Sequence, residues 1–310
     1  MMNSTARRTI GLMVAALFAL SACSSGGGTS PSVAASAAPS AAETSAASTE
    51  PSAAATAAAP SIAVPAAITT AGKLVWCVDV SYPPEESFKA DGTTAEGSDI
   101  DIATEVAKRF GVTPEIDNTS FTGIIASLTG KKCDLIISGM NDTAERAKQV
   151  AFVDYLKVGQ GLLVLAGNPK GIHTLEDLSG KAVAVQLGTT NKDALDAENV
   201  KLKAANKPQI DVQTFDQDTD AFQQLALGRV DAYSGDSPVC AYYAAKPDNA
   251  GKFEVGGTPI DPAPIGIAIR KDDTELQAAV KAAIDGMYAD GTMKSIIDKW
   301  GMTDAVVLLQ

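Results

Sequence analysis

From residue 74 onward, segments with the apolar spacing of strands alternate with segments that have the spacing of helices. Residues 74–78 and 133–138 are short apolar runs bounded by polar or turn-forming residues, which is typical of buried strands. Between them, Ile102, Val106 and Phe110 recur at every fourth position and therefore lie on one face of a predicted helix. Alternation of this kind predicts an α/β fold in which parallel sheets are covered by helices.

The same reasoning assigns the remaining elements of the chain. Extended segments are expected at residues 113–117, 151–166, 182–187, 209–215, 230–235, 253–256 and 265–270. Helices are expected at residues 98–110, 121–129, 143–149, 174–180, 191–198, 218–227, 238–246, 274–289 and 292–300. The N-caps that we predict for three of these helices are Ser98, Thr174 and Ser237.

Two stretches of the chain repeat one pattern at a constant offset. Asp134 precedes a strand that ends in the polar turn Ser138-Gly139, and Asp231 precedes a strand that ends near Gly235. Two similar lobes would explain this repeat. Ligands of such sheets bind beyond the carboxyl ends of the strands, so a site is expected in the cleft between the lobes if those ends face one another.

The first of these polar turns leads to an arginine. We interpret residues 143–149 as a helix with Asp142 as its N-cap and Glu145 at the capping-box position, which puts Arg146 close to the strand end. The planar fork of donors on a guanidinium is suited to binding a carboxylate through two hydrogen bonds. The alternative is a surface arginine that pairs with a neighbouring acid.

The N-terminus has the pattern of an exported, lipid-anchored chain. Two arginines precede an apolar run at residues 10–20, and the tetrad Leu-Ser-Ala-Cys that ends at Cys23 resembles the bacterial lipobox. We therefore expect a signal peptide at residues 1–22 and an acylated Cys23 that anchors the protein to the membrane on its extracytoplasmic side. Residues 23–65 are rich in Ala, Ser, Thr and Pro, which predicts a disordered tether.

The net charge and the hydropathy of the chain limit the kinds of partner that it can have. The formal charge of −12 disfavours nucleic acid as a partner, and no apolar segment after Cys23 approaches membrane-spanning length.

Cys77 and Cys133 lie in predicted strands, so an exported chain could join them by a disulfide if those strands are neighbours. Cys240 is then a small buried apolar side chain. These cysteines and His173 do not form a zinc set, and no metal or cofactor is expected.

Nine short stretches of the chain form a recognisable series. They begin at Asp79 (Asp-x-x-Tyr-Pro-Pro), Gly97 (Gly-x-Asp-Ile-Asp), Ser120 (Ser-Phe-x-Gly-Ile-Ile), Asp134 (Asp-Leu-Ile-Ile-Ser-Gly-Met), Thr143 (Thr-x-Glu-Arg), Val185 (Val-Gln-Leu-Gly-Thr-Thr), Gly228 (Gly-Arg-Val-Asp-Ala), Gly235 (Gly-Asp-Ser-Pro) and Asp290 (Asp-Gly-Thr). In this order they resemble the family 3 extracellular solute-binding proteins of polar amino-acid ABC importers. The resemblance covers nearly all of residues 72–301.

The resemblance implies an α/β fold of the two-lobed, periplasmic-binding-protein-like (type II) kind. Each lobe would be a mostly parallel sheet flanked by helices, and two strands would cross the hinge. Lobe 1 is expected at residues 66–160 and 261–310, and lobe 2 at residues 161–260. The function implied is capture of a polar amino acid in the cleft and its delivery, by a monomer, to the permease subunits of an ABC importer in the membrane.

The resemblance also implies which residues bind the charged ends of an amino acid. Arg146 would hold the carboxylate together with the backbone amides of Asn141 and Thr190. Asp236 would hold the ammonium group together with the Gly139 carbonyl, with Asn141 as a further contact. These roles describe a site that neutralises both charges of a zwitterion, whose desolvation is otherwise costly.

Other residues of the implied site surround the ligand's side chain or close the cleft. Asp79, Tyr82 and Phe121 would line the side-chain pocket, and Thr189 would close over the ligand from lobe 2 beside Thr190. The whole implied set is Asp79, Tyr82, Phe121, Ser138, Gly139, Asn141, Arg146, Thr189, Thr190 and Asp236.

The chain departs from the family pattern at a few positions. Glu85-Glu86 stands where an aromatic residue is more usual, Ser98 replaces a phenylalanine, and Asn141 replaces a hydroxyl residue. The extra acids near Asp79 could favour a ligand with a cationic side chain, or they could be solvated. Two other functions stay open: a dehydratase-like enzyme on the same fold, for which these acids are the only nearby acid–base candidates, and an amino-acid sensor or surface lipoprotein that works without a transporter.

Overall fold

The computed structural model describes residues 62–309. The predicted signal peptide, the lipid anchor at Cys23 and nearly all of the predicted tether lie outside these described residues. Within them, no helix is both long enough and apolar enough to span a bilayer. The described part begins with a short helix, α1 (Ala66–Ala71), which leads directly into the first strand.

Lobe 1 is built around β1 (Lys73–Val78), which has β4 (Thr113–Asn118) and β5 (Leu135–Ile136) as parallel neighbours. Alternate residues of β1 face opposite sides of the sheet, as the pleat requires. Leu74, Trp76 and Val78 belong to the core that includes helices α2 (Ser98–Phe110), α7 (Thr274–Ala289) and α8 (Thr292–Lys299). Val75 and Cys77 pack on the other side, against α3 (Ile124–Thr129).

Lobe 2 repeats this arrangement around β7 (Ala182–Gln186). Its parallel neighbours are β8 (Asp211–Phe215) and β9 (Ala232–Asp236). Val183 and Val185 of β7 pack with α4 (Thr190–Ala204), whereas Ala184 packs with α5 (Asp218–Ala226) and α6 (Ser237–Ala245). Each lobe therefore has three parallel strands and two apolar layers, as the alternating sequence pattern predicts.

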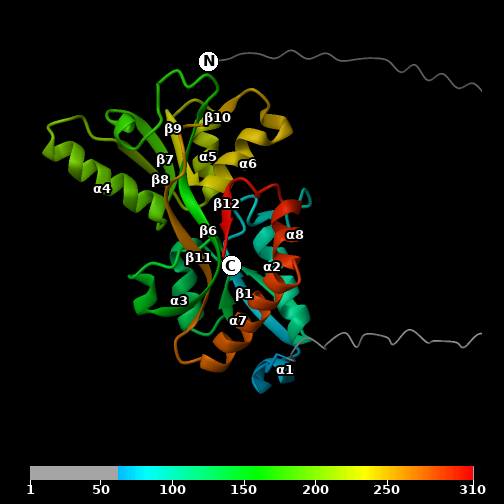
Figure 1. Ribbon diagram of the computed structural model, residues 1–310. Helices are drawn as coiled ribbons and strands as arrows, with labels where there is room; N and C mark the ends of the chain where they lie inside the picture. Colours follow the sequence, from blue (N-terminus) through cyan, green and yellow to red (C-terminus); the bar gives the residue numbers. More distant parts are fainter. Residues whose placement is uncertain (1–61, 310) are drawn as a thin grey trace, which may run out of the picture. The chain divides into compact units, whose positions relative to one another are not determined.

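Two long antiparallel strands connect the lobes. β6 (Val150–Leu165) and β11 (Ile260–Arg270) pair over most of their length, and Figure 1 shows them running from the helices of one lobe to those of the other. β11 pairs with β5 and β6 pairs with β9, so the strand order of the sheet is β4-β1-β5-β11-β6-β9-β7-β8. The two predicted hinge crossings are thus β6 and β11. The lobe boundaries at residues 160 and 261 stay a prediction.

The remaining elements are short. β10 (Phe253–Val255) and β12 (Val306–Leu308) add to β6, and β2 (Ser87–Phe88) pairs with β3 (Ala95–Glu96) in a small hairpin. Single 3₁₀ turns occur at η1 (Phe121–Gly123), η2 (Arg146–Lys148), η3 (Glu176–Leu178) and η4 (Pro247–Asn249).

The internal repeat in the sequence corresponds to a repeated interaction. The Asp134 carboxylate accepts a hydrogen bond from the Val75 amide (2.9 Å), and the Asp231 carboxylate accepts one from the Ala182 amide (3.0 Å). In both lobes the amide of the aspartate also donates to the carbonyl of that same partner, at 2.8 Å. Each aspartate therefore fixes a neighbouring strand to the first strand of its lobe.

Several expected helix starts are wrong. The helix predicted at 143–149 is only the 3₁₀ turn η2, and the Arg146 amide donates to the Thr143 hydroxyl (3.2 Å), so Thr143 and not Asp142 supplies the oxygen. Asp142 instead lies beside β11, where its amide donates to the Pro264 carbonyl (3.0 Å). A tertiary contact to a crossing strand thus replaces the local cap that the sequence suggested.

The N-caps of α2 and α6 also differ from expectation. Ser98 is the first residue of α2 and Gly97 is its N-cap, with φ at 143°, where a Cβ would meet the Glu85 carbonyl oxygen at 1.9 Å. Only glycine fits so close an approach. Ser237 is likewise the first residue of α6, after Asp236, and its hydroxyl donates to the Ala305 carbonyl (2.8 Å).

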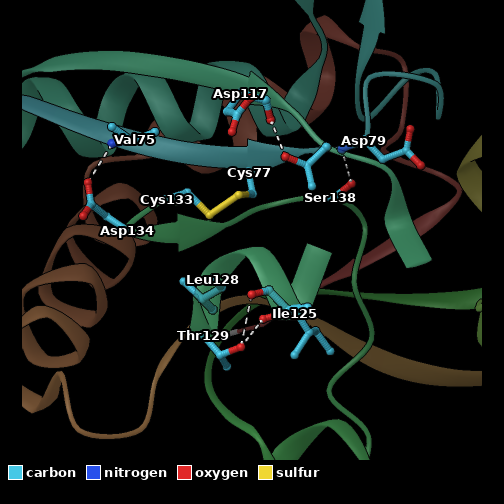
Figure 2. Close-up of a disulfide and its surroundings, with 12 residues drawn as sticks. Val75, Cys77, Asp79, Asp117, Ile125, Leu128, Thr129, Cys133, Asp134 and Ser138 are labelled. Carbon is cyan, nitrogen blue, oxygen red and sulfur yellow. Dashed lines mark hydrogen bonds between the residues drawn. A yellow bond between two sulfur atoms is a disulfide. The ribbon is translucent and has the colours of Figure 1, made fainter. Parts of the chain in front are cut away.

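A disulfide joins two neighbouring strands of lobe 1. Cys77 of β1 is bonded to Cys133, which precedes β5, with their Cα atoms 5.7 Å apart (Figure 2). Further along the same strands, the Asp79 amide donates to the Ser138 hydroxyl at 3.0 Å. Cys240 is free and buried on α6, as expected. The disulfide therefore joins β1 to the residue before β5, and the turn residues Asp79 and Ser138 follow these two strands further along the chain.

Candidate functional site

A polar cavity lies between the lobes, beyond the carboxyl ends of their parallel strands. Asp79 follows β1, Ser138 and Gly139 follow β5, and Gln186 and Asp236 end β7 and β9. The cavity is lined by Asp79, Tyr82, Glu86, Phe121, Ser138, Gly139, Asn141, Arg146, Gln186, Thr189, Thr190, Asn191 and Asp236. All the residues of the implied ligand set line it. Glu86, Gln186 and Asn191 were not predicted.

Arg146 is held in place by backbone carbonyls from both lobes. Its Nη1 donates to the Asn141 carbonyl (3.0 Å) and its Nη2 to the Gly188 carbonyl (3.1 Å), while the guanidinium lies 5.3 Å from the centre of the Phe121 ring. A guanidinium has five N–H donors, so these bonds orient the group and leave donors for a ligand anion. Burial lowers the pKa of Arg146 from its ordinary value and the nearby Asp236 opposes that shift.

The start of α4 faces the same cavity. Thr189 is the N-cap, and its hydroxyl oxygen accepts a hydrogen bond from the Lys192 amide (3.2 Å). Thr190, the first helical residue, donates from its hydroxyl to Asn141 Oδ1 across the cleft (2.7 Å). Free amides and the positive end of the helix dipole make this position favourable for an anion. The cavity thus has a cationic guanidinium and a helix N-terminus among its walls.

Asp236 supplies the opposite charge from lobe 2. It is the N-cap of α6 by position, but its side chain makes no capping hydrogen bond. Instead its Oδ1 accepts from Asn191 Nδ2 (2.9 Å), and its amide donates to the Tyr82 hydroxyl of lobe 1 (2.7 Å). Burial raises the pKa of Asp236 to about 6, against the effects of these hydrogen bonds and of Arg146. The Asp236 side chain is therefore engaged by Asn191 at the cavity and not by the start of α6.

Asp79 reaches the cavity from lobe 1. Its Oδ2 accepts from the Phe121 amide (3.0 Å) and from Gln186 Nε2 (2.7 Å), which belongs to lobe 2. Burial raises the pKa of Asp79, and its hydrogen bonds oppose this shift. Gln186 lies within the stretch Val-Gln-Leu-Gly-Thr-Thr and is the last residue of β7, just as Asp79 directly follows β1. This position at the end of a parallel strand is the sequence signal that could have identified Gln186 as a site residue.

Glu85 and Glu86 are both almost fully buried, so the prediction that they could be solvated is wrong. Glu86 lines the cavity and its Oε1 accepts a hydrogen bond from the Ser138 hydroxyl (2.7 Å). Burial and the neighbouring Asp99 raise the pKa of Glu86 well above its ordinary value. Asp99 accepts hydrogen bonds from the Gly139 amide (2.9 Å) and the Tyr155 hydroxyl (2.8 Å), and so fixes the turn after β5 from behind.

The side chains of residues 62–309 offer no group of three or more histidine, cysteine or acidic residues that could hold a metal ion. The groups of the cavity described above are one guanidinium, one helix N-terminus and buried carboxyl groups. Such a set can bind a small molecule that has both an anionic and a cationic group.

Comparison with known proteins gives the same family throughout. The sequence model of the bacterial extracellular solute-binding proteins, family 3, matches residues 74–303. The L-cystine-binding protein of Escherichia coli K12 is 33% identical over 230 residues, which are 74% of this chain and 82% of that protein.

Solved structures agree with this assignment. An ancestral arginine-binding protein bound to arginine superposes with a TM-score of 0.67 at 38% identity, over 74% of this chain and 98% of that one. An ancestral amino acid-binding protein, described as a precursor of cyclohexadienyl dehydratase, has a TM-score of 0.67 at 37% identity, over 76% of this chain and 97% of that one.

Proposed function

Because this chain belongs to the family 3 bacterial extracellular solute-binding proteins, we propose that it captures a free polar amino acid, or a similar zwitterion, for an ABC importer. The observation that supports this most strongly is that Arg146 from lobe 1 and Asp236 from lobe 2 line one cavity. The two groups have opposite charges, and both lie on rigid strand or turn positions. A zwitterion that bridges them would keep both of its charges paired after it leaves water.

We assign the carboxylate of the ligand to Arg146 and to the amides of Asn141 and Thr190. The ammonium group is assigned to Asp236 with the Gly139 carbonyl. A charged hydrogen bond is roughly twice as strong as a neutral one, so these two ends contribute most of the affinity. A micromolar dissociation constant requires about 8 kcal/mol, which an anchored carboxylate and a buried ammonium pair can supply.

Closure of the lobes completes the site. Hydrogen bonds from Thr190 to Asn141 and from Arg146 to Gly188 exist only when the lobes are together. A ligand that contacts both lobes therefore shifts the hinge toward the closed form, by as much as its affinity differs between the two forms. We propose that the closed monomer then docks on a membrane permease, and that acylated Cys23 keeps it on the extracytoplasmic side of the membrane.

A dehydratase is the second candidate, because one observation favours it. Glu86 is a buried carboxyl group that lines the cavity, and its raised pKa would suit a general acid. A structural relative is described as a precursor of cyclohexadienyl dehydratase. Binding is the better supported function because that relative is itself an amino acid-binding protein, as are the other two proteins above.

A screen of all common amino acids against the purified protein tests the proposed function. An amino acid at 100 times its dissociation constant should stabilise the folded protein by about 2.7 kcal/mol and raise its melting temperature by several degrees. The ligand should be recovered unchanged after long incubation. A screen in which no free amino acid moves the melting temperature would contradict capture, and conversion of the ligand would favour the enzyme.

The affinity for the ligand should fall as the pH drops below about 6. The pKa of Asp236 is raised to about 6 in the ligand-free cleft, whereas an ammonium ligand favours its ionised form. At pH 5 roughly one tenth of Asp236 is ionised, so the affinity should be about tenfold weaker than at pH 7.5. Titration calorimetry at the two pH values measures this. Asp236→Asn should bind weakly at both, and an unchanged wild-type affinity would contradict the role of Asp236.

The ligand-free protein should become more stable as the pH drops from 7 to 5, whereas its affinity for the ligand falls. Burial within lobe 1 raises the pKa of Asp99 to about 6, above its ordinary value. Between about pH 4 and pH 6 the folded protein therefore binds protons that the unfolded chain releases, so its stability falls as the pH rises through this range. Urea unfolding without ligand should show a higher midpoint at pH 5 than at pH 7.

A further inference from the structure

Gln186 makes a direct connection across the cleft. Its side chain leaves the end of β7 in lobe 2 and is 3% exposed. Nε2 donates to Asp79 Oδ2 of lobe 1 at 2.7 Å and to the Asp216 carbonyl of lobe 2 at 3.0 Å. Because one amide group has two N–H donors, both of them are used. The side chain is thus fixed at its own lobe and reaches the other.

Asp79 is the acid most suited to a cationic ligand side chain. Of the cavity's other carboxyl groups, Asp236 pairs with Asn191 and faces the ammonium site. Glu86 accepts a hydrogen bond from Ser138, and its burial and Asp99 raise its pKa, which disfavours its charged form. Asp79 lines the same cavity. A cation on the ligand would therefore have to bind Asp79, whose Oδ2 is already taken by the Phe121 amide and Gln186.

We propose that Gln186 is a specificity-determining residue, which holds Asp79 across the closed cleft so that ligands with uncharged side chains are favoured over cationic ones of similar size. This inference rests on the proposed amino-acid-binding function. A cationic side chain either displaces Gln186 from Oδ2 or is left with Oδ1 alone, so it gains less from Asp79 than it would without Gln186. An uncharged side chain leaves the pair intact. Loss of a hydrogen bond to a charged group corresponds to a difference in affinity of about tenfold or more.

Pairs of near-isosteric amino acids test this assignment. The probes are arginine with citrulline and 2,4-diaminobutyrate with homoserine, each titrated calorimetrically alongside the tightest neutral ligand from the screen. The wild-type protein should bind the neutral compounds more tightly. Gln186→Ala should raise the affinity for the cationic probes, relative to that neutral ligand, by about tenfold or more. Gln186→Glu should also raise it, because two carboxyl groups this close share one proton, and a cationic side chain can take the place of that proton.

A matched control separates selectivity from closure of the lobes. Ser237→Ala removes the hydrogen bonds that the Ser237 hydroxyl makes with the Ala305 carbonyl and the Gly159 amide, and it leaves Asp79 untouched. It should change the affinity for all ligands by the same factor. The isosteric Gln186→Glu variant guards against a folding defect in Gln186→Ala, and the melting temperature of each variant checks this.

Three results would overturn the inference, and they differ from a failure of the proposed function. The first is a wild-type protein that binds arginine or 2,4-diaminobutyrate more than tenfold more tightly than the neutral partner. The second is a cationic-to-neutral ratio that stays within threefold in both Gln186 variants. The third is an equal change of that ratio in Ser237→Ala. Failure of the proposed function would instead appear as a wild-type protein that binds no amino acid at all.

Discussion

Replacing Arg146 by alanine should weaken the binding of every amino acid ligand by about thirtyfold or more. Arg146 is held by the Asn141 carbonyl of its own lobe and lies over Phe121, so its donors are oriented before the lobes close on a ligand. Truncation of one partner of a buried, hydrogen-bonded charge pair costs about 2–5 kcal/mol, which corresponds to roughly 30-fold to several thousandfold in affinity. Titration calorimetry with the ligand found in the screen measures the loss.

Two variants serve as controls for Arg146→Ala. Arg146→Lys keeps the charge but lacks the planar fork, so its affinity should be intermediate. Lys148→Ala removes an exposed neighbour whose side chain pairs with Glu145, and it should bind as the wild type does. If Arg146→Ala retained an affinity within threefold of wild type, the carboxylate could not be bound where we place it.

Removal of the disulfide should lower the stability of the protein by about 2–5 kcal/mol. Cys77 and Cys133 are 56 residues apart in sequence, and closing a loop of that size stabilises a folded protein by roughly 4 kcal/mol in the chain-entropy model. The Cys77→Ala/Cys133→Ala double variant should therefore unfold at a clearly lower urea concentration than the oxidised wild type.

The reduced wild-type protein is the matched control for this variant. Reduction opens the same loop without changing the two residues, so it should produce most of the same loss. Cys240→Ala, which alters the free cysteine, should cost much less because no cross-link is lost. Equal unfolding midpoints for the double variant and the oxidised wild type would show that the bond does not stabilise the fold.

The fold was largely predictable because its signals are local. The apolar run at residues 74–78 is β1, and the helical spacing of Ile102, Val106 and Phe110 matches α2. The long extended segment at 151–166 corresponds to β6, whose pairing with β11 connects the lobes. Hydrophobic periodicity shows which face of a helix or strand is buried, and it can be read without knowing which other element packs against that face.

Features that depend on contacts between distant segments were predicted less well. The helix expected around Arg146 is a single turn because Asp142 bonds to β11, and the sequence near Asp142 contains no trace of that strand. The bond from Gln186 to Asp79 depends on how the lobes meet. For Glu86 the sequence left open whether the acid serves a cationic ligand or is solvated, because its partner Ser138 is remote in sequence.

The most direct test of zwitterion capture is a crystal structure of the protein with the amino acid that the screen identifies. The account predicts closed lobes with the ligand's carboxylate on the Arg146 guanidinium and its ammonium within hydrogen-bonding distance of Asp236. A ligand bound outside this cavity, or one whose carboxylate makes no contact with Arg146, would contradict the account.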